Sequence, residues 1–153
     1  MAQISQYVTL SIAGEVLALP VDRVREILSP QPIARLPGAP SRFLGMIEVR
    51  DRGVPVLDLR LTLGLAPAEM DENTRIVVVN ATIGDGDAPV GLMVDRVFEV
   101  TALDGDALEP PPEAAVGWRA EMIVGLGRRN GRFVTVLDFD RLFGTGELGL
   151  FAA

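Results

Sequence analysis

The chain contains an internal repeat, and this repeat constrains the fold more than any other feature of the sequence. Residues 43–64, FLGMIEVRDRGVPVLDLRLTLG, return as residues 123–144, IVGLGRRNGRFVTVLDFDRLFG, and the matched positions are all 80 apart. A second pair of segments, 17–27 (LALPVDRVREI) and 90–100 (VGLMVDRVFEV), matches at a separation of 73. Most of the chain is therefore two copies of one supersecondary unit of about 70 residues.

Each copy is rich in β-forming residues that are interrupted by tight turns. The segment from residue 7 to residue 19 predicts a hairpin, and Asp51-Arg52-Gly53 and Asn130-Gly131 each predict the turn of another. Strands this short, spaced by glycine-containing turns, are typical of small β-barrels. We therefore predict an all-β protein with a few short helices, built as two small β-barrels.

Short helices are expected at four positions, which form two matched pairs in the repeat. Pro20 is expected to open one that reaches Leu28, and residues 95–100 repeat it as a short helix or an extended turn. Asp58 and Asp138 stand where a helix N-cap belongs, and the helices that they begin are expected to end near Leu63 and Phe143.

The length of the chain bears on how the two copies are combined. A unit of about 70 residues is marginal alone, because a chain so short buries too little surface on folding. We therefore expect one domain over residues 1–153 in which the two copies share a hydrophobic core. The first barrel unit is expected at about 6–66, the second at about 73–144, and the tail 145–153 is expected to be loose.

Composition excludes several classes of function. The chain has no cysteine and no histidine, which removes disulfides, cysteine and histidine nucleophile chemistry and the commonest zinc ligands. Its net charge is −7 with one Trp and one Tyr, whereas nucleic-acid binding calls for a basic, aromatic surface. It has no apolar run of membrane-spanning length and does not start like a signal peptide. The sequence predicts a cytoplasmic protein that neither enters the membrane nor binds nucleic acid.

Two sets of acidic residues suggest catalysis or metal binding. Asp58 and Asp138 occupy matched positions, as the carboxylates of a hydrolase could, but the position of each also fits a helix cap. The Asp-Gly-Asp pairs at 85–87 and 104–106 lack the further acidic ligands of a calcium loop. We therefore expect no catalytic residue, no metal and no cofactor. An aspartate-dependent hydrolase remains the remote alternative.

The differences between the copies indicate where function resides. Around the turn at residues 51–53 the first copy places Glu48, Arg50, Asp51 and Arg52. At the matching positions the second copy has Arg128, Asn130, Gly131 and Arg132. The apolar residues Phe43, Leu44 and Val49 lie next to this charged cluster in the sequence. Charged side chains beside apolar ones on a rigid hairpin are typical of a protein-docking surface. A solvated turn with local ion pairs, or a small-anion site at Arg50 and Arg52, are the alternatives.

The chain resembles the CheW family of chemotaxis adaptors. The resemblance rests on five segments: GMIEVR (45–50) with VPVLDLR (54–60), VDRVREI (21–27), GLMVDRV (91–97), Pro110–Pro112, and Gly125-Leu-Gly with Leu137-Asp. It covers residues 6–144 in order. It implies two SH3-like five-stranded β-barrels around a shared core. It also implies a non-catalytic scaffold that couples chemoreceptor cytoplasmic tips to the regulatory domain of a CheA-type histidine kinase, with assembly into a hetero-ring.

The resemblance also assigns site residues. Arg50 matches the prominent arginine of the family, Gly45 its glycine, and Val24 and Glu26 match positions near the receptor groove. This sequence departs from the family at two positions, because Glu48 replaces an asparagine and Asp51 a glycine. These two acids flank Arg50, could pair with it, and favour an adaptor of a non-flagellar pathway such as surface sensing, pili or second-messenger control. The complete set of predicted partner-binding residues is Arg50, Gly45, Glu48, Asp51, Val24, Glu26, Phe43, Leu44 and Val49.

Overall fold

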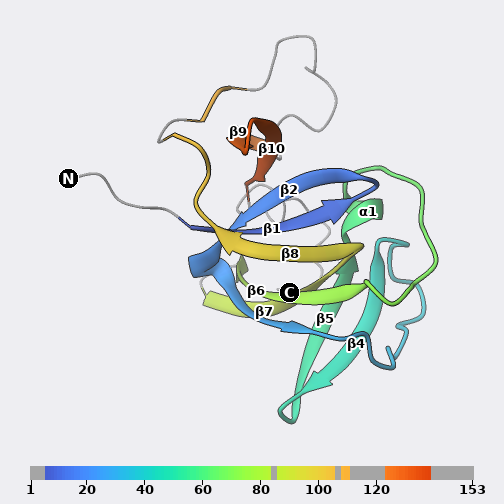
Figure 1. The fold of residues 1–153 in the computed structure, drawn as a ribbon. Helices are drawn as coiled ribbons and strands as arrows, with labels where there is room; N and C mark the ends of the chain where they lie inside the picture. The colour runs from blue at the N-terminus through green and yellow to red at the C-terminus, as the bar shows by residue number, and fades with distance from the viewer. Residues whose placement is uncertain (1–5, 84–85, 106–107, 111–122, 139–153) are drawn as a thin grey trace.

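The computed structural model describes residues 6–83, 86–105, 108–110 and 123–138. These residues form two five-stranded sheets, as the family resemblance implies (Figure 1). Sheet A has the order β8-β1-β2-β10-β9, and sheet B has the order β3-β6-β7-β5-β4. The strands of sheet A are β1 (Tyr7–Ile12), β2 (Glu15–Pro20), β8 (Arg96–Thr101), β9 (Ile123–Arg129) and β10 (Arg132–Leu137). Those of sheet B are β3 (Val24–Leu28), β4 (Phe43–Val49), β5 (Arg52–Asp58), β6 (Arg75–Ile83) and β7 (Gly86–Val94).

The strand registers repeat with the same separations as the sequence. In sheet B the parallel strands β5 and β7 place Val56 opposite Gly91, and in sheet A the parallel strands β10 and β2 place Val136 opposite Ala18. These pairs are related by the separations of 80 and 73 positions found in the sequence. The β4–β5 and β9–β10 hairpins also have a register shift at matching positions. The two sheets are therefore two versions of one pairing scheme.

Neither sheet is built from one copy alone. Sheet A combines the β1–β2 hairpin of the first copy with β8, β9 and β10 of the second, and sheet B makes the reciprocal combination. The chain passes from sheet A to sheet B at residues 21–23 and returns at Asp95. The expected boundary between barrel units at 6–66 and 73–144 therefore does not separate the two sheets, because sheet B occupies 24–94. Pairing between the copies buries the edges of both hairpins in larger sheets. The repeat in the sequence does not show that strands of one copy pair with strands of the other.

The helix expected over residues 20–28 is wrong. A single 3-10 turn, η1 (Val21–Arg23), leads into strand β3. The segment of the second copy that corresponds to β3 is strand β8. In β3 the side chains alternate between partly buried and exposed, as in a strand. Both segments pair with a hairpin of the other copy, β3 with β6 and β8 with β1. Tertiary pairing therefore overrides the local helical pattern.

The predicted cap at Asp58 is confirmed. Helix α1 (Leu59–Thr62) follows β5, and the Asp58 carboxylate accepts a hydrogen bond from the backbone N–H of Leu61 at 3.3 Å. The corresponding helix after Asp138 and the tail 145–153 lie outside the described residues.

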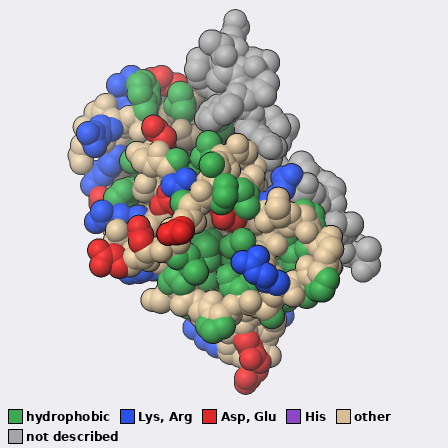
Figure 2. Space-filling view, turned by 90° about the vertical axis from the view of Figure 1, so that its right-hand side faces the viewer, with side chains coloured by type: hydrophobic (Ala, Val, Ile, Leu, Met, Phe, Trp, Pro, Cys, Tyr) green, Lys and Arg blue, Asp and Glu red, His purple; other side chains and the backbone are tan. Residues whose placement is uncertain are grey.

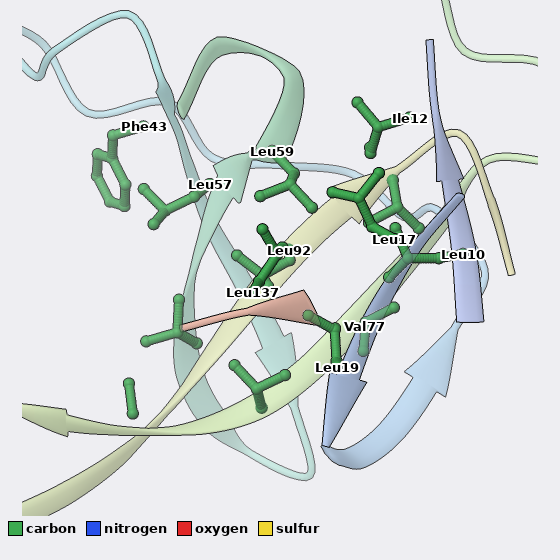
Figure 3. Close-up of a cluster of buried hydrophobic side chains, with 14 residues drawn as sticks. Leu10, Ile12, Leu17, Leu19, Phe43, Leu57, Leu59, Val77, Leu92 and Leu137 are labelled. Carbon is green, nitrogen blue, oxygen red and sulfur yellow. The ribbon is translucent and has the colours of Figure 1, made fainter. Parts of the chain in front are cut away.

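The largest hydrophobic cluster takes side chains from both sheets (Figure 3). Leu10, Leu19 and Leu137 come from sheet A, whereas Leu57, Val77 and Leu92 come from sheet B. Leu59 of α1 is fully buried in the same cluster. Each sheet also has a smaller cluster of its own. The shared core expected from the length of the chain is therefore present between the sheets. No helix among the described residues is long and apolar enough to cross a membrane.

Candidate docking surface

The β4–β5 hairpin ends in a two-residue turn with an unusual backbone. Arg50 and Asp51 both have positive φ, 50° and 65°, as the central residues of a type I′ turn do. The matching turn of sheet A has Asn130 and Gly131 at φ 54° and 80°, the residues that such a turn favours. Because an L-residue with a Cβ is strained at positive φ, the first hairpin holds Arg50 on a strained turn. The hairpin projects from one end of the molecule, away from the β9–β10 hairpin (Figure 1).

Replacing Asp51 with glycine is expected to raise the free energy of unfolding by about 0.5–1 kcal/mol, because glycine adopts positive φ without steric cost. Urea denaturation of the variant and the parent measures the change. The matched control is Gly131→Ala in the equivalent turn, which is expected to lower stability by a similar amount. We also expect Asp51→Gly to preserve or tighten partner binding. A less stable Asp51→Gly variant would mean that the carboxylate stabilises the turn by more than the backbone strain costs.

The side chain of Arg50 pairs with Glu26 of strand β3. Its Nη1 donates to Glu26 Oε2 at 2.9 Å, and the arginine side chain is 76% exposed while the glutamate is 21% exposed. The expectation that the flanking acids Glu48 and Asp51 pair with Arg50 is therefore wrong. Glu26 lies on β3, which is the other edge strand of the same sheet, so the pair joins two segments that only the folded sheet brings together. The pair holds the guanidinium beside the carboxylate and leaves most of it open to a partner.

A shallow groove surrounds this pair. It is lined by Arg25, Glu26, Val49, Arg50, Arg52, Val54, Val78 and Pro89. The valines at positions 54 and 78 belong to the cluster inside sheet B, so the apolar part of the groove has a rigid base. The structure thus brings together three predicted site residues, Glu26, Val49 and Arg50. Arg25 and Pro89 were not predicted as site residues, because their strands meet this turn only in the folded sheet.

Four other predicted site residues are structural. Phe43 is only 6% exposed and lies in the shared core. Gly45 is buried at φ 144°, and a Cβ there would lie 2.2 Å from the carbonyl oxygen of Ala34. Leu44 packs against the cluster of sheet B, and Val24 packs against the shared core. Glu48 and Asp51 are exposed beside the turn. These placements concentrate the exposed candidates at the tip of the hairpin.

The β9–β10 hairpin of sheet A has a similar ion pair in a different chemical setting. Arg129 Nη2 lies 3.3 Å from Glu99 Oε1 on β8, as Arg50 lies beside Glu26 on β3. The Arg128 guanidinium lies 4.3 Å from the centre of the exposed Phe133 ring. Asp104 accepts a hydrogen bond from the Gly131 N–H at 3.0 Å, and backbone hydrogen bonds of this turn hold the pKa of Asp104 below its usual value. Both sheets therefore present a charged hairpin tip tied to an edge strand.

Exposed apolar side chains occur at matched positions of two edge strands. Ile27 on β3 is 41% exposed and Val100 on β8 is 51% exposed, and the two positions are 73 apart in the repeat. Phe98, also on β8, is 45% exposed. Figure 2 shows hydrophobic side chains gathered on one face and bordered by acidic and basic ones. Apolar patches with a charged rim are typical of protein-interaction surfaces.

Asp58, considered for catalysis, and Arg50, considered for small-anion binding, have other roles. Asp58 is 9% exposed and caps α1, and it lies in sheet B, whereas Asp138 follows β10 of sheet A. Arg50, a candidate for anion binding, is already beside the carboxylate of Glu26. Within the described ranges no three His, Cys, Asp or Glu side chains are grouped so that they could hold a metal ion.

Comparisons with known proteins agree with this architecture. The family model of the CheW-like domain matches residues 6–147. The chemotaxis protein CheW of Klebsiella aerogenes is 28% identical over 95% of this chain and 85% of that protein. Protein PilI of Pseudomonas aeruginosa is 31% identical over 69% of this chain and 58% of that protein. The crystal structure of scaffolding protein TtCheW from Thermoanaerobacter tengcongensis superposes with a TM-score of 0.81 at 26% identity, and covers 95% of this chain and 96% of that one. The chain therefore belongs to the CheW-like domain family, whose members are non-enzymatic scaffold proteins with this paired SH3-like fold.

Proposed function

We propose that this protein is a cytoplasmic scaffold that couples the cytoplasmic tip of a chemoreceptor to the regulatory domain of a CheA-type histidine kinase. The observation that carries the proposal is the Arg50 tip. An exposed guanidinium stands at the end of a rigid hairpin, held by Glu26 at 2.9 Å, over a groove with an apolar base. A charge-assisted contact beside apolar surface supports specific binding to another protein.

The paired architecture supports more than one contact for each molecule. Each sheet has its own hairpin tip, and the two hairpins lie at opposite ends of the molecule (Figure 1). A molecule with two pseudo-equivalent surfaces that face apart can contact two neighbours, and such heterologous contacts close into a ring when the rotation allows it. We propose that this chain takes part in a hetero-ring with kinase regulatory domains.

Arg50→Glu is expected to weaken binding by about 2 kcal/mol or more, since reversing a charge at the centre of a contact turns attraction into repulsion. Calorimetric titration against a kinase regulatory domain, and separately against a receptor-tip fragment, measures the loss. The matched control is Arg35→Glu, which makes the same change of charge at another exposed arginine. The melting temperature should change little, because the Arg50 side chain is mostly exposed.

A second variant separates partner contact from structural pairing. The double change Glu26→Arg with Arg50→Glu restores the ion pair in the opposite sense. If Arg50 contacts a partner, the double variant stays defective, whereas a merely structural pair would be rescued. Parent-like binding of Arg50→Glu to both partners would refute the assignment of this tip as the docking surface.

A further inference from the structure

Another ion pair lies away from the two hairpin tips, where the chain returns from sheet B to sheet A. Arg60 of helix α1 faces Asp95, the residue between β7 and β8. The guanidinium donates from Nε to Asp95 Oδ1 at 2.8 Å and from Nη2 to Oδ2 at 2.6 Å. Two parallel hydrogen bonds between arginine and carboxylate fix both distance and orientation, which a single contact does not.

The Asp95 carboxylate also contacts sheet A. Its Oδ2 accepts a hydrogen bond from the backbone N–H of Ala13, in the β1–β2 turn, at 2.8 Å. The backbone N–H of Asp95 donates to the Ser11 carbonyl oxygen of β1 at 3.2 Å. One residue is therefore bonded to the helix that follows β5 of sheet B and to the first hairpin of sheet A.

This pair is better shielded from water than the pairs at the hairpin tips. The side chains of Arg60 and Asp95 are 21% and 29% exposed, compared with 76% for Arg50. Burial acts to raise the pKa of the Asp95 carboxyl, but the hydrogen bonds from Arg60 and from the Ala13 N–H outweigh it and lower that pKa below its ordinary value. The hydrogen bond to Asp95 raises the pKa of Arg60. Both groups are charged at neutral pH, and the pair persists there.

The repeat does not provide this contact twice. Asp95 corresponds to Asp22 in the other crossover, but Arg60 corresponds to Asp140, which has no guanidinium to donate. Asp22 is exposed in the η1 turn. At the position that matches Arg60 the second copy therefore has an acidic residue instead of an arginine.

We propose that Arg60 and Asp95 are positioning residues that fix the orientation of sheet A relative to sheet B. They thereby set the distance between the β4–β5 and β9–β10 hairpin tips. A scaffold that contacts a neighbour at each tip needs that distance to be fixed, and this consequence rests on the proposed function. The proposal that the pair fixes the orientation of the two sheets does not depend on that function.

The experiment measures the distance between the tips directly. The chain has no cysteine, so Arg52→Cys and Arg132→Cys, at matched positions beside the two turns, give the only attachment sites for a pair of spin labels. Pulsed electron spin resonance then gives the distribution of label separations in the full chain. In the Asp95→Asn variant, which loses the charge of the pair, we expect a distribution at least twofold broader than in the parent. Arg60→Lys, which keeps the charge but not the two parallel hydrogen bonds, should be intermediate.

The matched control is Asp22→Asn, the same substitution at the position that corresponds to Asp95 and is exposed, and it should leave the distribution unchanged. Circular dichroism checks that each variant is folded. If Asp95→Asn does not fold, Arg60→Lys decides the question. A folded Asp95→Asn or Arg60→Lys variant with the parent distribution would overturn the proposal.

A titration of the unlabelled Asp95→Asn variant with the kinase regulatory domain tests the consequence for binding, for which we expect about a tenfold loss of affinity. If the parent itself does not bind that domain, the proposed function fails while the distance measurement still decides the role of the pair. If binding is normal but the distribution broadens, the positioning role stands and the need for a fixed tip distance is refuted.

Discussion

Leu137→Ala is expected to lower the free energy of unfolding by about 2–5 kcal/mol, because a large side chain is removed from a packed core that cannot fully close around the space. Leu137 is 1% exposed and lies in the cluster shared by the two sheets (Figure 3). Leu57, its counterpart in the repeat, is 4% exposed in the same cluster, so Leu57→Ala should fall in the same range. Chemical denaturation monitored by circular dichroism measures both losses.

The control for these variants is Val124→Ala on β9, where the side chain is 51% exposed. Its expected cost is below about 0.5 kcal/mol, as for most surface substitutions. Losses of similar size at Leu57 and Leu137 would support the equivalence of the two copies. A Leu137→Ala variant as stable as the parent would contradict the burial of this residue in the shared core.

The Gly45→Ala variant is expected to lose about 3–5 kcal/mol of stability, from backbone strain together with broken hydrogen bonds. At φ 144° only glycine is unstrained, and the added Cβ would lie 2.2 Å from the Ala34 carbonyl oxygen. The segment at Ala34 would have to move away from β4, where it exchanges two backbone hydrogen bonds of 2.8 Å with Met46. Thermal and chemical unfolding of the variant measure the loss.

Gly53→Ala provides the matched control on the facing strand β5. A Cβ at Gly53 would lie 3.1 Å from the terminal methyl of Met46, which is flexible and can move. We therefore expect a change of less than about 1 kcal/mol at Gly53. Equal losses at the two glycines would show that the close approach at Ala34 is not what requires glycine at position 45.

The candidate site was only partly predictable. Arg50 could be singled out because the copies differ at the turn and because the family resemblance points to it. The resemblance also pointed to Glu26, but nothing in the sequence indicated that Glu26 pairs with Arg50, since 24 residues separate them. Phe43 and Gly45 were assigned to the surface, yet the structure buries both. A match to a family motif looks the same in a sequence whether the residue contacts a partner or supports the strand that does.

What the sequence determined by itself is the local chemistry and its repetition. Two separations, of 80 and 73 positions, predicted two equivalent sheets, and their registers match at those separations. Turn residues predicted the hairpins, Asp58 predicted the cap of α1, and the small size of each copy predicted a shared core. These features depend on neighbours in the chain or on total buried surface, and both can be read from a sequence.

Only the tertiary structure decided which copy each strand pairs with. Strand β3 leaves its own hairpin and pairs with β6, and β8 pairs with β1, so segments with a helical pattern became edge strands. Because the two copies are similar, pairing within a copy and pairing between copies satisfy the same local preferences. The difference is decided by what the whole molecule can bury, and by single contacts such as Arg60 with Asp95 that exist only where the two sheets meet.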